Sequence, residues 1–272
     1  MAKNNKKLYL SALTPCCVDY YPQSGKFYAG GNSLNVAAVW NGLEPQSHVS
    51  VITCLGNDEY GKIILDFLEK TTIDCSRVYV KEGITANNQL RVDEKGERFG
   101  VEGAWQGGVY ETFLLSEKDW EWINQQDIVA MPANNPNFPH MLRRKHKDQL
   151  LSVDYLDAEN NIPMQETVAL TDIAFISAHP DLLPFYRKLA DKTKKLIVVT
   201  LGAEGSYAFY NGLSHYQPAL PAPKVTDTTG CGDAYQAAFA LNYYRTRDIQ
   251  RSMLSGAGAA LRVLQHWGGA GI

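Results

Sequence analysis

A polar, glycine-rich loop that leads into a helix of small residues is the segment best suited to chemistry. It reads Asp-Thr-Thr-Gly-Cys-Gly-Asp over residues 227–233, and Ala234 begins the small-residue run. Glycine lets the backbone turn sharply and approach a ligand closely. The free N–H groups at a helix start, together with the helix dipole, favour an anion. The loop therefore predicts a phosphate-binding site of the kind that phosphoryl transfer requires.

Asp233 falls in the first turn of that helix. Beside a phosphate pocket, its carboxylate would serve as a general base that accepts the proton of an attacking hydroxyl. The alternative is that Asp233 only complements the helix dipole, and spacing alone slightly favours that alternative. Two other phosphate motifs are excluded: the chain has no G-x-x-x-x-G-K-[ST] run, and Tyr235 replaces the third glycine of a dinucleotide fingerprint.

A second glycine-rich segment precedes a predicted helix near the start of the chain. Gly30 and Gly31 are followed by Asn32, a good N-cap residue, and by Asn35 one turn later. The two asparagines share one helix face, and their amides donate and accept hydrogen bonds, which suits a polyhydroxyl ligand. The alternative is a capped helix with an incidental second asparagine.

Two polar segments follow predicted strands. Asp19 comes just after the first strand, at the kind of edge where open α/β sheets bind ligands, and it is either a sugar ligand or a turn residue. Thr200 ends a later strand and leads into a turn that contains Gly202 and Gly205. That turn either receives a nucleotide or is a plain tight turn.

Short apolar runs alternate with longer helical ones. We predict strands over residues 8–13, 49–55, 127–133, 150–157, 172–178 and 196–201. We predict helices over residues 32–42, 58–70, 116–124, 137–147, 180–193, 231–244 and 249–265. Several strands are apolar on both faces, which favours an α/β fold with a mainly parallel sheet and helices on both faces.

Residues 77–103 break this rhythm. Two β-like runs over 89–92 and 98–101 flank a turn and predict a hairpin, and a further β-like stretch covers 20–29. Together they form either a small lid or surface hairpins without a role. Another hairpin is expected to turn at Asn211 and Gly212.

Composition narrows the class of protein. The chain has 272 residues, a net charge of -3 and 45% hydrophobic residues, which fits one α/β domain with or without a small appendage. Nothing in this balance favours nucleic acid or an anionic membrane as a partner. Five cysteines without a C-x-x-C pair fit free thiols, and the polar start predicts no targeting or membrane segment. We therefore expect a cytoplasmic protein.

Taken together, these segments resemble the ribokinase (pfkB-type) family. Residues 227–233 are similar to its C-terminal signature D-T-x-G-A-G-D, and residues 30–35 to its N-terminal signature. Residues 56–61 match its G-x-D-x-x-G motif, and residues 200–205 resemble its nucleotide-side turn. The resemblance implies a single ribokinase-like domain over residues 1–272, with a small β lid formed by about 15–29 and 77–106.

Within that family the chain is most similar to bacterial fructoselysine 6-kinases, in residues 17–23, 30–32, 83–86 and 115–119. This implies an ATP-dependent kinase that transfers the γ-phosphoryl group to a sugar hydroxyl, namely the 6-hydroxyl of fructoselysine or a related fructosamine. A kinase of a simple sugar or nucleoside with the same fold is the alternative. A sugar-binding regulator without catalysis is a further one.

The resemblance also implies residue roles. Asp233 would be the catalytic base. The backbone amides of the anion hole would belong to Gly230, Cys231 and Gly232. The sugar ligands would be Asp19, Gly30, Gly31, Asn32 and Asn35. The ATP site would be lined by Thr200, Gly202, Gly205 and Thr228. Mg²⁺ would arrive with ATP, a monovalent cation would lie near the loop of Asp227, and the lid would pair in a homodimer.

Two departures from the family pattern matter. Cys231 replaces the usual alanine, and because cysteine is small enough for the loop and contributes through its backbone, we expect activity to survive. A reactive thiol is the open alternative, since helix N-termini lower thiol pKa values. The N-x-x-E motif that binds the metal and its waters in relatives is not evident, so the metal ligands are unknown and Asp181 is only a candidate. Contacts to an amino-acid tail of the substrate are expected from polar lid residues: Asn87, Asn88, Gln89, Arg91 and Arg98.

Overall fold

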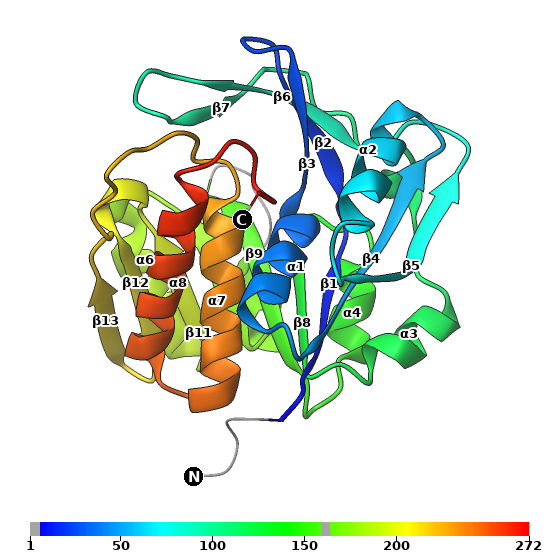
Figure 1. The fold of residues 1–272 in the computed structure, drawn as a ribbon. Helices are drawn as coiled ribbons and strands as arrows, with labels where there is room; N and C mark the ends of the chain where they lie inside the picture. Colours follow the sequence, from blue (N-terminus) through cyan, green and yellow to red (C-terminus); the bar gives the residue numbers. More distant parts are fainter. Residues whose placement is uncertain (1–5, 159–163, 272) are drawn as a thin grey trace.

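The larger of two β-sheets forms the centre of the computed structural model, which describes residues 6–158 and 164–271 (Figure 1). Its strands are β1 (Tyr9–Leu13), β4 (His48–Gly56), β5 (Asp74–Lys81), β8 (Ile128–Pro132), β9 (Leu150–Asp157), β10 (Ile173–Ser177), β11 (Leu196–Thr200), β12 (Ser206–Tyr210) and β13 (Leu213–Gln217). Their order is β13-β12-β11-β10-β9-β8-β1-β4-β5. Pairing is parallel from β11 to β5, whereas β12 and β13 are antiparallel.

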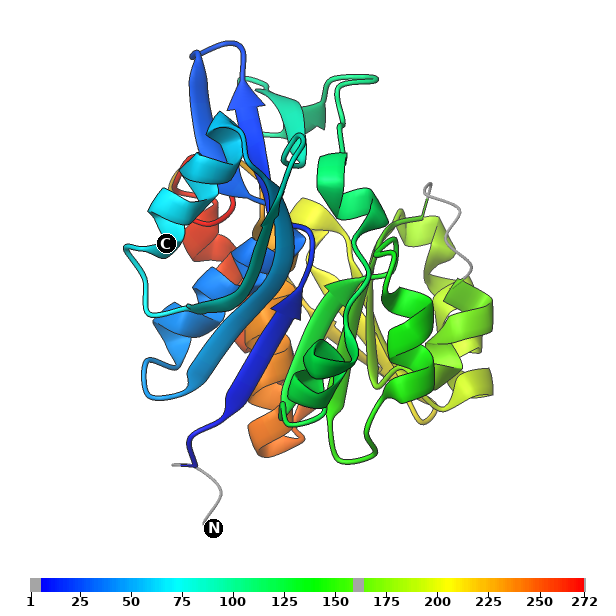
Figure 2. The ribbon, with the colours of Figure 1, turned by 90° about the vertical axis from the view of Figure 1, so that its right-hand side faces the viewer.

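Helices cover both faces of this sheet, as predicted (Figures 1 and 2). They are α1 (Asn32–Leu43), α2 (Glu59–Leu68), α3 (Glu117–Ile123), α4 (Phe138–Arg144), α5 (Met164–Thr167), α6 (Leu183–Thr193), α7 (Cys231–Thr246) and α8 (Ile249–Val263). Along β10, Ile173 and Phe175 enter one hydrophobic core, and Ala174 and Ile176 the other, because strand side chains alternate. No helix in the described part of the chain is long and apolar enough to cross a membrane.

The predicted elements differ from the observed ones mainly at their ends. The helix expected over residues 180–193 begins as a 3₁₀ turn (Pro180–Leu182) before α6, and the helix expected to reach residue 147 ends at Arg144. Other 3₁₀ turns cover Gly108–Thr112, Val168–Leu170 and Gly202–Glu204. The hairpin at Asn211 and Gly212 is confirmed, and both residues have positive φ. Residues 1–5, on which the absence of a targeting segment partly depends, lie outside the described residues.

A smaller sheet projects above the carboxyl ends of the parallel strands (Figure 1). It consists of β2 (Cys17–Tyr21), β3 (Lys26–Gly30), β6 (Asn87–Val92) and β7 (Arg98–Gly100), in the order β3-β2-β6-β7. It includes less of the chain than the lid that was expected over residues 15–29 and 77–106. Residues 77–81 belong instead to β5, which pairs with β4 at the edge of the large sheet.

The G-x-D-x-x-G motif anchors the start of β6. Asp58 Oδ1 accepts hydrogen bonds from Thr85 Oγ1 at 2.6 Å and from the Gly61 amide at 2.9 Å, which caps α2. A Cβ on Gly56 would lie 2.2 Å from the carbonyl oxygen of Gly83. Only glycine permits this approach, so the motif fixes where the chain enters the small sheet.

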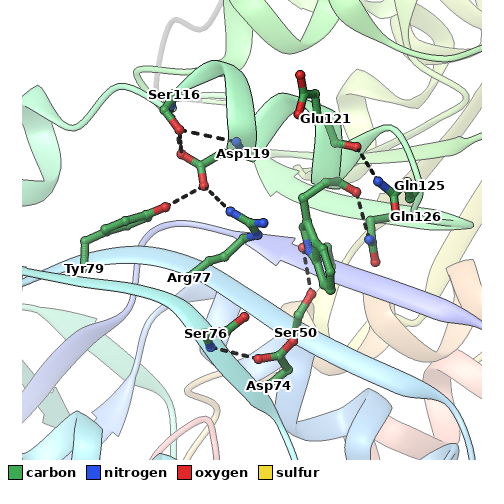
Figure 3. A network of polar contacts seen from close by, with 12 residues as sticks. Ser50, Asp74, Ser76, Arg77, Tyr79, Ser116, Asp119, Glu121, Gln125 and Gln126 are labelled. Carbon is green, nitrogen blue, oxygen red and sulfur yellow. Dashed lines mark hydrogen bonds and ion pairs between the residues drawn. The ribbon is translucent and has the colours of Figure 1, made fainter.

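A buried polar network holds α3 against the edge strand β5 (Figure 3). Asp119 Oδ1 accepts hydrogen bonds from Arg77 Nη1 at 2.9 Å and from the Tyr79 hydroxyl at 2.6 Å. Asp119 also forms a capping box with Ser116 at the start of α3. Because these donors satisfy a carboxylate whose residue is only 1% exposed, the network is a structural feature of the edge.

Candidate active site

The carboxylate of Asp233 is held by two amides from the first turn of α1. Asn32 Nδ2 donates to Asp233 Oδ1 at 2.6 Å, and Asn35 Nδ2 donates to Asp233 Oδ2 at 2.7 Å. The Oδ1 atoms of both asparagines are buried and have no hydrogen-bond partner among the described residues. A buried acceptor without a partner is costly, so these two oxygens are suited to the hydroxyl groups of a polyol.

The expectation that Asn32 caps α1 is wrong. The N-cap is Gly31, whose φ is 94°, and no side chain caps the helix. The Asn32 side chain is instead directed to Asp233 through its Nδ2, and its Oδ1 accepts no hydrogen bond from the helix end. A Cβ on Gly31 would lie 2.7 Å from the carbonyl oxygen of Pro15, which explains the requirement for glycine.

Asp19 lies inside strand β2 of the small sheet, and not at the edge of the large sheet as expected. Because strand side chains alternate, Asp19 and Tyr21 share one face of β2. A Cβ on Gly30 would lie 2.4 Å from Asp19 Oδ2 and 3.8 Å from Asn35 Oδ1. The glycine therefore leaves room for the Asp19 carboxylate beside the Asn35 amide.

The electrostatics of the site favour a proton acceptor near neutral pH. Burial raises the pKa of Asp233 to about 6, and the nearby charge of Asp19 contributes to this rise. Burial also raises the pKa of Asp19 to about 7. The positive charge of Arg98 opposes both shifts. Asp233 is therefore mostly ionised at neutral pH, and it remains basic enough to take a proton from a hydroxyl.

Asp154 is a site residue that the sequence analysis missed. Its Oδ2 accepts a hydrogen bond from Asn32 Nδ2 at 3.0 Å, and its Oδ1 accepts one from the Leu156 amide at 2.8 Å. Burial, followed by the charge of Asp233, raises its pKa to about 7. The sequence does contain a signal for this site residue, because Asp154 follows the apolar run of β9 toward the carboxyl end of that strand, where α/β sheets bind ligands.

The glycine-rich loop packs against the end of the chain. Gly230 has a φ of 78°, and a Cβ on it would lie 2.5 Å from the Cα of Gly269. A Cβ on Gly269 would in turn lie 2.4 Å from Asn35 Nδ2. The C-terminal glycines therefore form a layer between the loop and α1. The Gly-Gly-Ala-Gly run over residues 268–271 is the sequence signal for this close packing, which was not predicted.

The start of α7 fits the predicted anion site only in part. No side chain caps this helix, which leaves first-turn amides such as that of Gly232 open to an anion. The Cys231 amide donates within the loop to the Thr228 carbonyl at 3.3 Å. The alternative of a reactive thiol is disfavoured, because burial raises the pKa of Cys231 to about 12.

Comparison with known proteins identifies the family. The sequence matches the pfkB family carbohydrate kinases over residues 7–271. The chain belongs to this family of kinases. It is 30% identical over 267 residues to the fructoselysine 6-kinases of Escherichia coli and Shigella flexneri, covering 95% of this chain and 98% of each relative. The ribokinase of Arabidopsis thaliana, solved with ribose and ATP, shares the fold with a TM-score of 0.80 and 22% identity, over 97% of this chain and 94% of that one.

The turn that was expected to lie on the nucleotide side is between β11 and β12. Thr200 ends β11, and its hydroxyl lies 3.2 Å from that of Ser177 at the end of β10. Gly202 and Gly205 have positive φ, and a Cβ on Gly205 would lie 2.2 Å from the Gln217 carbonyl oxygen. Among the described residues, none of these three candidates hydrogen-bonds to Asp233, so they form a group separate from the asparagines.

Thr228 is engaged with the small sheet of the kinase. Its amide donates to the Gly96 carbonyl at 3.0 Å, and its hydroxyl accepts a hydrogen bond from the Arg98 amide at 2.8 Å. The hairpin between β6 and β7 thus contacts the glycine-rich loop over residues 227–233 directly. This contact also brings the guanidinium of Arg98 near enough to influence Asp233.

The candidate for the metal-water motif in this kinase is exposed. Asp181 pairs with His179 at 3.1 Å, and its side chain is 88% exposed. In residues 6–158 and 164–271, no group of three or more His, Cys, Asp or Glu side chains is arranged to hold a metal ion.

Proposed function

We propose that this pfkB kinase phosphorylates the 6-hydroxyl of fructoselysine or a related fructosamine. Asp233 takes the proton of the hydroxyl, and the hydroxyl oxygen attacks the γ-phosphorus of ATP. The bond between that phosphorus and the bridging oxygen of ADP breaks, which gives the phosphorylated sugar and ADP. The observation that carries this role is the hydrogen bonding of Asp233 by Asn32 and Asn35, whose own Oδ1 atoms have no partner among the described residues.

Three relatives support the substrate. Two are the fructoselysine 6-kinases at 30% identity, and the third is the fructosamine kinase of Bacillus subtilis, at 25% identity over 93% of this chain. A catalytically inactive regulator is disfavoured, because Asp233 and the open start of α7 are both retained. The free thiols of the described cysteines suit an enzyme that acts in the cytoplasm.

The remaining site residues have the roles that their positions support. Asp19 and the backbone at Gly30 and Gly31 would contact the sugar beside the two asparagines, while the amides of Gly230, Cys231 and Gly232 would approach the transferred phosphoryl group. ATP would be bound by the segments that contain Thr200, Gly202, Gly205 and Thr228. Mg²⁺ bound to ATP phosphates needs only one or two protein carboxylates, and Asp154, which accepts a hydrogen bond from Asn32 beside Asp233, would be one of them. Mg²⁺ would neutralise phosphate charge during transfer.

The amino-acid tail of a fructosamine would contact the site face of β6. Asn88 pairs in register with Asp19 and shares its face of β6 with buried Leu90. Gln89 and Arg91 are exposed on the other face of β6. Of the polar lid residues that were expected to contact the tail, we therefore retain Asn88 and Arg98. We further propose that the small sheet closes over the sugar and pairs in a homodimer.

A coupled ATP-consumption assay with Mg²⁺ tests the substrate. The panel is fructoselysine, a second fructosamine, fructose, ribose and adenosine. We expect fructoselysine to have a kcat/KM at least about 10⁴-fold above that of fructose, because unpaired groups of a tail site reject ligands that lack the tail. An equal or higher kcat/KM for fructose, ribose or adenosine would contradict the fructosamine assignment and leave a kinase of simpler acceptors.

A further inference from the structure

Asp227 is a buried carboxylate whose oxygens are fully used by the protein. The residue is 0% exposed. Its Oδ1 accepts from the Thr229 amide at 2.9 Å and from the Thr229 hydroxyl at 2.7 Å. Its Oδ2 accepts from the Tyr21 hydroxyl at 2.6 Å and from the Gly268 amide at 3.0 Å. A buried charge must be compensated, and here four hydrogen bonds supply the compensation.

The Tyr21 hydroxyl is the donor that comes from the small sheet. The ring is 0% exposed, and it packs edge-on against Tyr28 and Trp267 at centroid distances of 5.4 and 5.5 Å. Burial and the bond to Asp227 raise the pKa of Tyr21 well above its usual value, so it stays a proton donor. The hydroxyl also lies 3.0 Å from Thr229 Oγ1. It is therefore fixed among the oxygens of the loop.

A monovalent cation, as expected near this loop, does not fit these contacts. An ion bound at the Asp227 carboxylate would have to displace one of its donors, because each carboxylate oxygen already accepts two hydrogen bonds. The Tyr21 hydroxyl occupies the position beside both side chains. The Tyr21 hydroxyl therefore helps to compensate the charge of Asp227, which a bound cation would otherwise do.

We propose that the hydroxyl of Tyr21 replaces a monovalent cation in ordering the 227–233 loop, so that this kinase works without potassium. Tyr21 is a positioning residue that acts through Asp227 and Thr229 on the amides at the start of α7. It also connects strand β2, which carries Asp19, to the loop that approaches the phosphates. The inference rests on the proposed use of this loop in phosphoryl transfer.

The test is Tyr21→Phe, measured in potassium chloride and in tetramethylammonium chloride at equal ionic strength. For the wild-type enzyme we expect kcat in the two salts to agree within about twofold. In tetramethylammonium we expect kcat of the variant to fall by about 10- to 100-fold, because a hydrogen bond to a buried charge is lost. Potassium should restore much of the lost kcat by binding where the Tyr21 hydroxyl was, beside Asp227 and Thr229. The matched control is Tyr20→Phe, since Tyr20 lies on the opposite face of β2, stacked on Phe27.

A melting curve of each protein without substrate separates this inference from the proposed function. We expect potassium to raise the melting temperature of Tyr21→Phe, but not that of the wild type or of Tyr20→Phe, whatever sugar the enzyme accepts. Strong activation or stabilisation of the wild type by potassium would overturn the proposal. A Tyr21→Phe variant with wild-type kcat in tetramethylammonium, or one with reduced kcat that potassium does not restore, would also overturn it.

Discussion

Asn35 Nδ2 lies 2.7 Å from Asp233 Oδ2, and this bond joins residues 198 positions apart in the chain. It connects the first turn of α1 to the first turn of α7, so the two glycine-rich signatures form one site. The amide of Asn35 also opposes the rise in the pKa of Asp233 that burial causes. The same side chain therefore positions the proposed base and adjusts its charge state.

Arg98 should control the pH dependence of the reaction. Its charge lowers the pKa of Asp233, so Arg98→Gln should raise that pKa above about 6. The base must be ionised to act, and the acidic limb of kcat/KM should therefore move to higher pH. With each protein's activity at pH 8 as its own reference, we expect the variant to keep about 3- to 10-fold less activity at pH 6 than the wild type, because the loss of the Arg98 contact to the tail is the same at both pH values. The control is Arg91→Gln, on the other face of β6, and equal profiles for all three proteins would contradict the assignment.

Asn88 should distinguish a fructosamine from a plain sugar. Asn88→Ala is expected to raise KM for fructoselysine by about 10-fold, because a polar partner of the tail is removed, and to leave KM for fructose unchanged. Gln89→Ala is the matched control, since Gln89 is exposed on the other face of the strand. Equal effects of the two variants on fructoselysine would show that the site face of β6 does not bind the tail.

Gly230 should tolerate no side chain. A Cβ would meet the backbone of Gly269 at 2.5 Å, and the φ of 78° is strained for any other residue. We expect Gly230→Ala to displace the loop and lower kcat by about 10²-fold or more, as misplaced catalytic groups commonly do. Gly258→Ala, in open space on α8, should keep wild-type kcat. Near-wild-type kcat for Gly230→Ala would refute this role of the loop.

Asp154 should make the protein less stable as the pH rises. Its pKa is about 7 in the fold against 3.8 for the ordinary group, so between pH 4 and 7 the folded state binds the extra proton. The resulting stabilisation is complete below pH 4 and is lost as the pH rises through 7. The melting temperature of Asp154→Asn should therefore fall less between pH 5 and 8 than that of the wild type. Each 1 kcal/mol of difference in the free energy of unfolding corresponds to a difference of roughly 2–4 °C in melting temperature.

The exposed residue Asp148 provides the control for that measurement. Asp148→Asn should follow the wild-type dependence on pH. If Asp154→Asn did so too, Asp154 would not carry the raised pKa.

The local chemistry of the chain predicted most of the fold. Apolar runs such as β11 and amphipathic helices such as α2 carry their own periodicity, and the turn at Asn211 and Gly212 follows from residues that accept positive φ. Element ends were less predictable, because they depend on tertiary contacts. Asn32 is the clearest case, since its side chain bonds Asp233 instead of capping α1.

The missed site residues share a physical reason. Asp154, Tyr21 and Gly269 lie in three separate stretches of sequence, and each acquires its role only through a partner far along the chain. Local spacing says nothing about such pairs. Cys231 shows the converse, because its position at a helix start suggested a reactive thiol, whereas burial in the fold keeps it protonated.

The most direct test of the account is the turnover of Asp233→Asn with fructoselysine and MgATP. The amide keeps the shape of the side chain but cannot accept the hydroxyl proton as a base. We predict a fall in kcat of about 10²- to 10⁴-fold, with the Kd for ATP within about twofold of the wild type. A variant that turned over fructoselysine at the wild-type rate would contradict the assignment of Asp233 as the catalytic base.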